Sequence, residues 1–162
     1  MTGPHDATPE VRLRAVEDHD LEVFFDHQSD PQALEMAAFP ARDRDAFAAH
    51  WARLRADDTL TTRTIVADGE VAGNIGSWAQ DGQQLLGYWI GREWWGRGVA
   101  TRAVALLVDE LPVRPLHAHV AVHNLGSVRV LEKCGFRRDR VQEATEPAPA
   151  DGVEERIYVL DA

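Results

Sequence analysis

The sequence predicts a single α+β domain with a mixed, mostly antiparallel sheet of about seven twisted strands and about four flanking helices. Three strand-like runs between residues 61 and 90 are separated by Asp-Gly turns, which is typical of an antiparallel meander. The hydrophobic period changes from two to the helical value at residue 99. The chain has 162 residues, of which 44% are apolar, and this suits one compact core. We expect residues 1–9 to be a flexible tail and residues 10–162 to form the domain.

Before the meander, the chain carries one short strand and two helical segments. Residues 11–16 alternate apolar and polar side chains, as a half-buried strand does. Apolar residues then recur at helical spacing over residues 17–28, with Asp18 as the predicted N-cap, and again over residues 43–55. The stretch between these two helices is ambiguous, and Pro40 interrupts it.

The rest of the chain supplies the remaining strands and two further helices. Strand patterns occupy residues 61–68, 71–80, 83–90, 116–123, 136–142 and 154–161. Helical spacing of apolar residues occurs over residues 99–111 and 124–135. In the second of these helices, Asn124 stands at the N-cap and Gly135 just after the last turn.

Composition and charge exclude several classes of protein. The net charge is −10, from 17 basic and 27 acidic residues, whereas a general nucleic-acid binder needs clustered cations. The single cysteine excludes an internal disulfide framework. There is no run of about 20 apolar residues and no apolar signal segment at the start. We expect a cytoplasmic protein, a monomer or homodimer, with neither a nucleic-acid nor a membrane partner.

Residues 92–101, REWWGRGVAT, have the composition of an anion-binding turn. A helix N-terminus leaves about four N–H groups unpaired and carries roughly half a positive charge, so it attracts anions. Gly96 and Gly98 permit positive φ and let a ligand approach the backbone. Arg97 and Arg102 add full charges. The glycines alone are equally explained by a tight turn between a strand and a helix.

Positive charge is concentrated in two segments of this acidic chain. Residues 92–102 hold three arginines against one glutamate, and residues 127–140 hold five basic residues against two acidic ones. Such islands favour a polyanionic small molecule over a long polymer. A P-loop motif is absent, and the glycines only approximate a dinucleotide fingerprint because Thr101 stands at its sixth position. The strand that follows ends in His123 rather than in an acidic residue, so a nicotinamide oxidoreductase is the weaker alternative.

Two motifs carry a family resemblance. The first is Trp95-Gly96-Arg97-Gly98-Val99-Ala100, with small residues at its fourth and sixth positions. The second consists of Asn124, Ser127, Gly135 and Phe136 in an N-x-x-S…G-F pattern. Together they resemble the GNAT superfamily of acetyl-CoA-dependent N-acetyltransferases, and the most similar branch includes the bacterial ribosomal-protein N-terminal acetyltransferases. The first motif is similar to the Q/R-x-x-G-x-G/A segment of that family, with tryptophan in place of the usual Gln or Arg.

The resemblance implies a site for acetyl-CoA as co-substrate and no metal. The backbone of Ile90 and Gly91 is expected to contact the pantetheine arm. The pyrophosphate is expected to be held by Trp95, Gly96, Arg97, Gly98, Val99, Ala100 and Thr101. Asn124 is expected to bond the pantetheine. Arg129 and Lys133, one helical turn apart, are expected to reach the 3′-phosphate.

The resemblance also implies direct attack of a neutral amine on the thioester within a ternary complex. Ser127 is expected near the thioester sulfur, where it protonates the departing thiolate directly or through water. Many relatives carry a glutamate two residues before the Gly-Tyr of the fourth strand, and this chain has Leu85 there. Glu93 is the predicted base. The other candidates are Glu35, His119, His123 or a water chain.

The acceptor is predicted to be a primary amine, either the α-amine of a protein or peptide or a small molecule. Its pocket is expected to be formed by residues 18–55, residues 141–153 and the fourth strand. The rival hypothesis, which Leu85 keeps open, is a catalytically silent acyl-CoA-binding sensor on the same fold.

Some of these residues also have simpler explanations. Asn124 suits an N-cap without any ligand. Cys134 suits a small buried side chain better than a nucleophile. His117 and His119 alternate on one strand but lack a third metal ligand in the sequence pattern.

Overall fold

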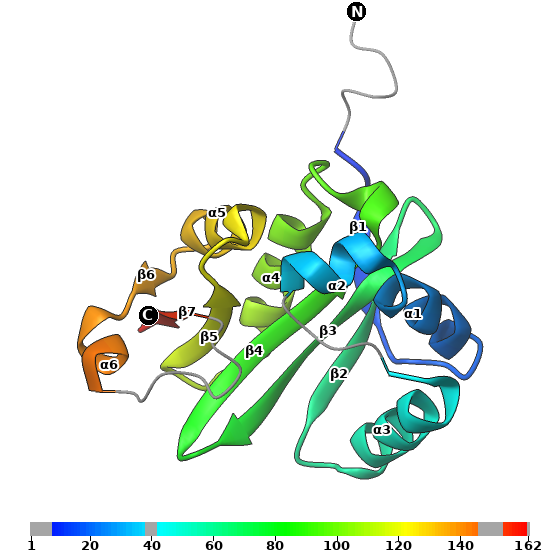
Figure 1. The fold of residues 1–162 in the computed structure, drawn as a ribbon, viewed down its shortest axis with the longest axis horizontal. Helices are drawn as coiled ribbons and strands as arrows, with labels where there is room; N and C mark the ends of the chain where they lie inside the picture. The colour runs from blue at the N-terminus through cyan, green and yellow to red at the C-terminus, as the bar shows by residue number, and fades with distance from the viewer. Residues whose placement is uncertain (1–7, 38–41, 146–153, 162) are drawn as a thin grey trace, which may run out of the picture.

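The computed structural model describes residues 8–37, 42–145 and 154–161 (Figure 1). The strands are β1 (Val11–Arg14), β2 (Thr61–Ala67), β3 (Glu70–Gln80), β4 (Gln83–Ile90), β5 (Leu116–Ala121), β6 (Arg137–Arg138) and β7 (Glu155–Leu160). The helices are α1 (Asp20–Gln28), α2 (Pro31–Ala37), α3 (Arg44–Ala56), α4 (Val99–Glu110), α5 (Leu125–Lys133) and α6 (Arg140–Thr145), with a 3₁₀ turn η1 (Arg92–Trp94). None of these helices has the length and apolar content needed to span a membrane.

The strands form one seven-stranded sheet in the order β1-β2-β3-β4-β5-β7-β6. Every neighbouring pair is antiparallel except β4 and β5, which run parallel. The predicted mixed, mostly antiparallel sheet of seven strands is thus confirmed. The described residues contain six α-helices, more than the four expected, because α2 and α6 are short and lack a sustained apolar period.

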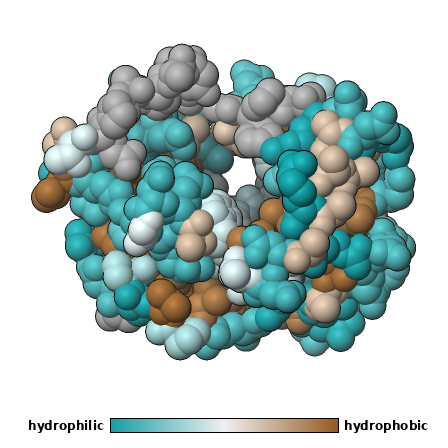
Figure 2. All heavy atoms as spheres, turned by 90° about the horizontal axis from the view of Figure 1, so that it is seen from below, coloured by the Kyte–Doolittle hydropathy of each residue, from teal (hydrophilic) through white to brown (hydrophobic). Residues whose placement is uncertain are grey.

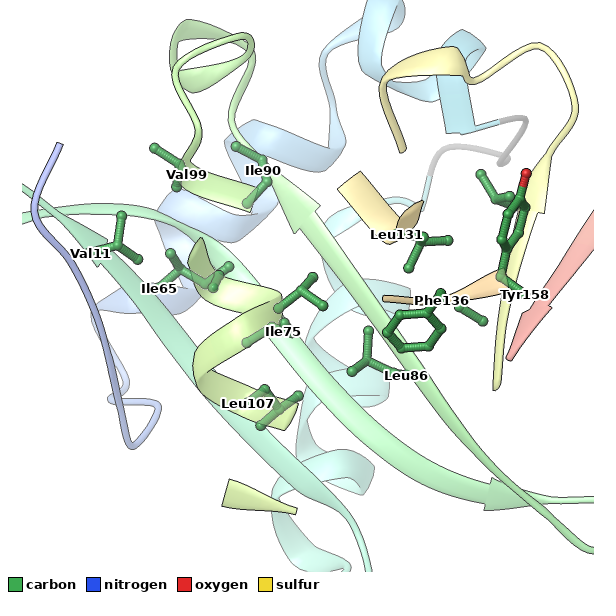
Figure 3. Packing of buried hydrophobic residues seen from close by; sticks show 14 of the residues in the cluster. Val11, Ile65, Ile75, Leu86, Ile90, Val99, Leu107, Leu131, Phe136 and Tyr158 are labelled. Atoms are coloured by element: carbon green, nitrogen blue, oxygen red, sulfur yellow. The ribbon is translucent and has the colours of Figure 1, made fainter. Parts of the chain in front are cut away.

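The core lies on both faces of the sheet. On one face, Val99 and Leu107 of α4 pack over Ile65 and Ile75 of the meander (Figure 3). Burial of these side chains stabilises the domain by about 1.5–3 kcal/mol each and fixes the position of α4. A smaller cluster joins α1 to α3, and its buried members are Phe24, Phe47 and Trp51. Seen from below, the exposed surface is mostly hydrophilic and is hollowed near its centre (Figure 2).

The starts of α3 and α1 are capped differently. Asp43, where the helical spacing begins, is the N-cap of α3, because its carboxylate accepts the N–H of Ala46 at 2.8 Å. The prediction for α1 is wrong, since the helix begins at Asp20 and its N-cap residue is His19, with no side-chain cap. The ambiguous stretch forms α2, while Pro40 lies outside the described residues.

The strand predicted over residues 136–142 is also wrong in its second half. Only Arg137 and Arg138 pair with β7, and α6 follows. The change has a local cause, since the carboxylate of Asp139 accepts the N–H of Gln142 and so begins the helix. The carboxylate of Glu143 on α6 then accepts the N–H of Ile157 at 2.9 Å. This side chain takes the place of the backbone acceptor that a longer β6 would offer to β7.

A buried ionic network ties α1 to β1 and β2. Asp20 is fully buried, and its carboxylate accepts two hydrogen bonds from Arg14, at 2.7 and 2.9 Å. The backbone N–H of Glu17 and the hydroxyl of Thr64 donate to the same carboxylate, at 2.9 and 2.7 Å. Burial alone raises the pKa of Asp20, but the hydrogen bonds from Arg14, Glu17 and Thr64 outweigh it and lower that pKa to about 2.

Replacing Asp20 is expected to destabilise the fold. Asp20→Asn should lower the free energy of unfolding by about 3 kcal/mol at neutral pH, because it leaves Arg14 without its buried partner. Since the pKa of Asp20 is lower in the folded chain than its ordinary value of 3.8, its contribution is complete above pH 4. That contribution should fall away as the pH drops from about 4 to about 2. Urea unfolding of both proteins across this range measures the effect.

Asp18→Asn is the matched control. Its side chain is 94% exposed and pairs with Arg55 at the surface, so the change should cost less than about 1 kcal/mol. Two results would contradict the role assigned to the network. One is an equal loss of unfolding free energy in the two variants, and the other is a stability difference between parent and Asp20→Asn that does not change with pH.

Candidate functional site

The sheet opens between β4 and β5. These strands pair only at Gln84 with Leu116 and at Leu85 with His117, and they diverge beyond Leu85. Past the divergence, β4 leads through η1 into α4, and β5 leads into α5. The N-termini of both helices therefore follow the strand ends that border the gap.

The backbone of β4 beyond Leu85 presents polar groups to this gap. The N–H of Gly91 donates to the carbonyl of Ala72 on β3 at 2.8 Å. Because successive residues of an antiparallel strand point their backbone groups to opposite sides, Tyr88 and Ile90 direct theirs away from β3. The carbonyl of Ile90 accepts the indole N–H of Trp95 at 3.0 Å, which leaves the N–H of Ile90 facing the gap.

A cavity of about 510 Å³ occupies the open end of the gap. Most of the residues predicted to bind the coenzyme line it, namely Ile90, Trp95, Gly96, Gly98, Val99, Ala100, Thr101, Asn124, Ser127, Arg129 and Lys133. Residues about 40 positions apart in the chain are thus brought to one surface by the divergence of two strands.

The N-terminus of α4 faces this cavity without a side-chain cap. Gly98 occupies the N-cap position with φ +81°, and Gly96 precedes it with φ +72°. Both conformations belong to the left-handed region that glycine adopts without steric cost. The first intrahelical hydrogen bond runs from Arg102 N–H to the Gly98 carbonyl, so the preceding N–H groups have no helical acceptor. They are arranged to bind an anion.

Helix α2 forms part of the cavity wall. Ala33, Met36 and Ala37 line the cavity with apolar side chains. The helix is held at both ends, since Asp30 pairs with Arg92 at 2.8 Å and the carbonyl of Glu35 lies 3.0 Å from the His123 imidazole. The sequence pattern did not predict a helix in this segment, because the segment is held by residues far along the chain.

Gly91, predicted to contact the pantetheine arm with its backbone, is not among the residues that line the cavity. Its N–H is taken by Ala72, and its carbonyl accepts the N–H of Trp94 at 2.9 Å. A Cβ on Gly91 would lie 2.5 Å from Nε2 of His27, which is buried against it. This glycine therefore makes room for the His27 ring rather than for a ligand.

Arg97 and Glu93 also point elsewhere. The guanidinium of Arg97 stacks over the ring of Trp94 at 4.5 Å. Glu93 is 67% exposed and lies 3.7 Å from His27, outside the residues that line the cavity. Burial lowers the pKa of His27, and the charge of Glu93 opposes that shift. The structure does not bring the predicted base Glu93 to the cavity.

The two cationic islands divide into paired and cavity-facing residues. Arg92, Arg137 and Arg138 form ion pairs with Asp30, Asp161 and Glu143. Arg129 and Lys133, at i and i+4 on α5, line the cavity instead. The local positive charge available to an anion there comes from these two side chains and from the N-terminus of α4.

A pair of hydroxyl groups lines the cavity. The phenol oxygen of Tyr88 and Oγ of Ser127 are 2.7 Å apart. Asn124 caps α5 by accepting the N–H of Ser127 at 3.2 Å, which fixes the position of that serine. Burial raises the pKa of Tyr88 to about 12, so the phenol stays protonated throughout the neutral range.

Sequence reasoning missed Tyr88, because an aromatic residue in a strand usually belongs to a core. The sequence does contain one signal for Tyr88, which is its spacing from Ile90. The two residues are two positions apart and so lie on the same face of β4, and Ile90 was predicted to contact the coenzyme.

Two other predicted candidates have structural settings of their own. Cys134 is half-buried with Sγ 3.4 Å from the carbonyl of Thr101, and burial raises its pKa, which fits a packing side chain. Among the described residues, the one group of three or more side chains with potential metal ligands within 4.8 Å of one another is Glu17, His19 and Asp20. It does not include His117 or His119, and the carboxylate of Asp20 is already bonded to Arg14.

Comparison with known proteins places these features in a family. Residues 10–137 match the model of the acetyltransferase (GNAT) domain. An 80-residue stretch is 39% identical to the probable N-acetyltransferase YjcK of Bacillus subtilis, and it spans 47% of this chain and 43% of that relative. The chain thus covers less than half the length of YjcK.

Solved structures resemble the whole fold. RimJ of Mycobacterium smegmatis, in complex with CoA-disulfide, has a TM-score of 0.75 at 22% identity, over 94% of this chain and 82% of that one. Spermidine N-acetyltransferase of Vibrio cholerae, in complex with CoA and spermine, has a TM-score of 0.73 at 17% identity, over 92% of both chains.

A negative charge at the start of α4 should weaken anion binding. Gly98→Asp is expected to raise the dissociation constant for CoA about tenfold or more, because a carboxylate repels phosphate at a site that the helix dipole favours. Calorimetric titration measures the change. Gly98→Asn has the same size without the charge and tolerates the left-handed backbone, so it should retain more affinity. Indistinguishable Asp and Asn variants would refute an anion site at this turn.

Proposed function

Because the chain belongs to the GNAT acetyltransferase family, we propose that it transfers the acetyl group of acetyl-CoA to a primary amine by direct attack in a ternary complex. The observation that carries the proposal is the single cavity that joins the uncapped N-terminus of α4 to the Tyr88–Ser127 pair. One end of this cavity suits phosphate, and the other suits a departing thiolate.

The residues present fit acetyl-CoA. The N–H groups after Gly98 are placed for the pyrophosphate, and Arg129 and Lys133 supply charge for the 3′-phosphate. The cavity continues past the open edge of β4, where a pantetheine arm can take the place of the missing strand. The N–H of Ile90 is available to stabilise the oxygen of the thioester as negative charge develops on it.

Tyr88 and Ser127 act on the leaving group. An alkyl thiol has a pKa of about 8.5, so transfer of a proton from a phenol with a pKa of about 12 is uphill by roughly 5 kcal/mol. Tyr88 is therefore suited to donate a hydrogen bond that stabilises the thiolate. The proton that finally reaches sulfur is better supplied by water or through Ser127.

The acceptor we propose is an amine of low pKa, such as the α-amine of a protein or peptide. An α-amine with a pKa of about 7.8 loses its proton at pH 7 for about 1 kcal/mol, whereas a lysine side chain needs roughly 4.6 kcal/mol. Leu85, where relatives carry glutamate, is buried and supplies no base. Such a site favours amines that need little help to deprotonate.

The decisive experiment incubates the protein with acetyl-CoA and a panel of amines while free thiol is detected. The panel contains a dipeptide amide with a free α-amine, phenethylamine, spermidine and an N-acetylated lysine-free peptide as blank. Thiol release that requires an amine supports the transferase. Calorimetric binding of acetyl-CoA without release on any amine favours the silent acyl-CoA sensor.

Removing the Tyr88 hydroxyl should slow the reaction without abolishing coenzyme binding. Tyr88→Phe is expected to lower kcat about 100-fold, because one preorganised donor to the leaving group is lost. The affinity for CoA should change little. Tyr158→Phe is the matched control, since the other tyrosine of the chain is buried in the core away from the cavity and its replacement should leave kcat near the parent value. Equal effects of the two changes would count against the role of Tyr88.

A further inference from the structure

A second, smaller cavity of about 150 Å³ adjoins the first at the gap between β4 and β5. The two cavities share the lining residues Ala37, Tyr88, Asn124 and Ser127. The hydroxyl pair therefore stands in the wall common to both spaces. A chemical group bound in the smaller cavity is therefore adjacent to the part of a molecule in the larger cavity that contacts Tyr88 and Ser127.

The smaller cavity has the opposite electrostatic character. His119 of β5 and Glu155 of β7 line it, and no lysine or arginine is found among its described lining residues. The larger cavity carries Arg129 and Lys133 instead. A cation is favoured on one side of the Tyr88–Ser127 pair and a polyanion on the other.

The register of the sheet brings His119 and Glu155 together. In the antiparallel pairing of β5 with β7, His119 lies opposite Ile157, and Ala121 lies opposite Glu155. His119 and Glu155 are therefore diagonal neighbours on one face, a spacing within reach of long side chains. Both are exposed, whereas Ile157, directly opposite His119 on β7, is buried.

The strand that carries Glu155, β7, is held firmly. Ile157, two residues on, donates its N–H to Glu143 at 2.9 Å, and its carbonyl accepts the N–H of Asp139 at 2.7 Å. These bonds replace the pairing that the short β6 does not provide. The carboxylate of Glu155 is thus borne on a fixed strand.

We propose that the smaller cavity is the acceptor subsite, in which Glu155 attracts a cationic primary amine and His119 accepts its proton. The proposal rests on the proposed function and deepens it. It replaces Glu93, which lies outside both cavities, as the source of the base. An imidazole suits this task because one ring nitrogen of its neutral form accepts a hydrogen bond or a proton.

The reaction balances with these groups. The ammonium gives one proton to His119, and the neutral nitrogen attacks the thioester carbon, forming the C–N bond. The C–S bond breaks and the electron pair leaves with sulfur, which Tyr88 stabilises by hydrogen bonding. The nitrogen then loses its second proton. One of the two released protons ends on the thiol and the other in solvent, so the products are an amide, CoA thiol and one proton.

The role of Glu155 is tested by Glu155→Gln against Glu154→Gln. Loss of the carboxylate should raise KM for the amine about fivefold, with kcat and the dissociation constant of CoA nearly unchanged. Glu154, an exposed neighbour, is not among the lining residues, and its replacement should leave all three constants at parent values. An unchanged amine KM in Glu155→Gln overturns this assignment.

The role of His119 is tested by His119→Ala with added imidazole. Loss of the base should lower kcat about 100-fold, and imidazole in the buffer should restore part of the rate, which a structural role does not allow. His19→Ala, at an exposed histidine that lines neither cavity, should neither slow the enzyme nor respond to imidazole. A His119→Ala variant with parent kcat, or a slow one that imidazole does not rescue, overturns the assignment.

A binding measurement separates this proposal from the broader one. In the presence of CoA, the dipeptide amide with a free α-amine should shift the imidazole NMR signals that disappear in His119→Ala. If the parent enzyme acetylates amines, these signals do not shift and both variants have parent kinetics, then the acceptor subsite is wrong but the proposed function is not. A parent protein that binds acetyl-CoA, releases no thiol with any amine and shows no shift defeats the proposed function as well.

Discussion

The divergence of β4 from β5 is the constraint on which the rest of the site depends. A continuous ladder would pair the backbone of Tyr88 and Ile90 with β5 and leave no room for a ligand. The structure limits that ladder to two residue pairs. Unpaired backbone groups are costly when buried, so they require other partners. Trp95 satisfies the carbonyl of Ile90, and the open N–H groups become binding groups for whatever fills the gap.

The same divergence aligns two helix N-termini with the cavity, and packing keeps them there. Val99 and Leu107 are buried against the sheet, so α4 cannot rotate without losing core contacts. Its dipole is thereby fixed in direction, and Gly98 lets the chain turn into it without a side chain over the N–H groups. At α5, by contrast, a side chain covers the helix start: the amide oxygen of Asn124 accepts the N–H of Ser127 and so fixes the position of that serine.

Local signals in the sequence were enough for much of this architecture. The period of residues 99–111, the cap at Asn124 and the Asp-Gly turns each act within a few positions, and each is found in the structure. The turn after Trp95 was located on the same basis.

The features that local signals did not show depend on partners distant in sequence. Gly91 makes room for the His27 ring, 64 positions earlier. Glu93 lies beside His27, and α6 is fixed by Ile157. Tyr88 was not predicted as a site residue, because the feature that marks it is the contact of its hydroxyl with Ser127, 39 positions later. Such contacts depend on the register of the sheet, which no single segment reveals.

The acidity of the chain does not conflict with a polyanionic substrate. At physiological ionic strength the screening length is about 8 Å, so a ligand responds to nearby charges rather than to the net charge of −10. Arg129 and Lys133 lie on one side of the Tyr88–Ser127 pair, and His119 and Glu155 lie on the other. In the proposed reaction, CoA is therefore attracted to one side of this pair and a cationic amine to the other. The Tyr88–Ser127 pair is half-buried, so the effective dielectric constant there is lower and a hydrogen bond to a leaving group would be stronger than in water.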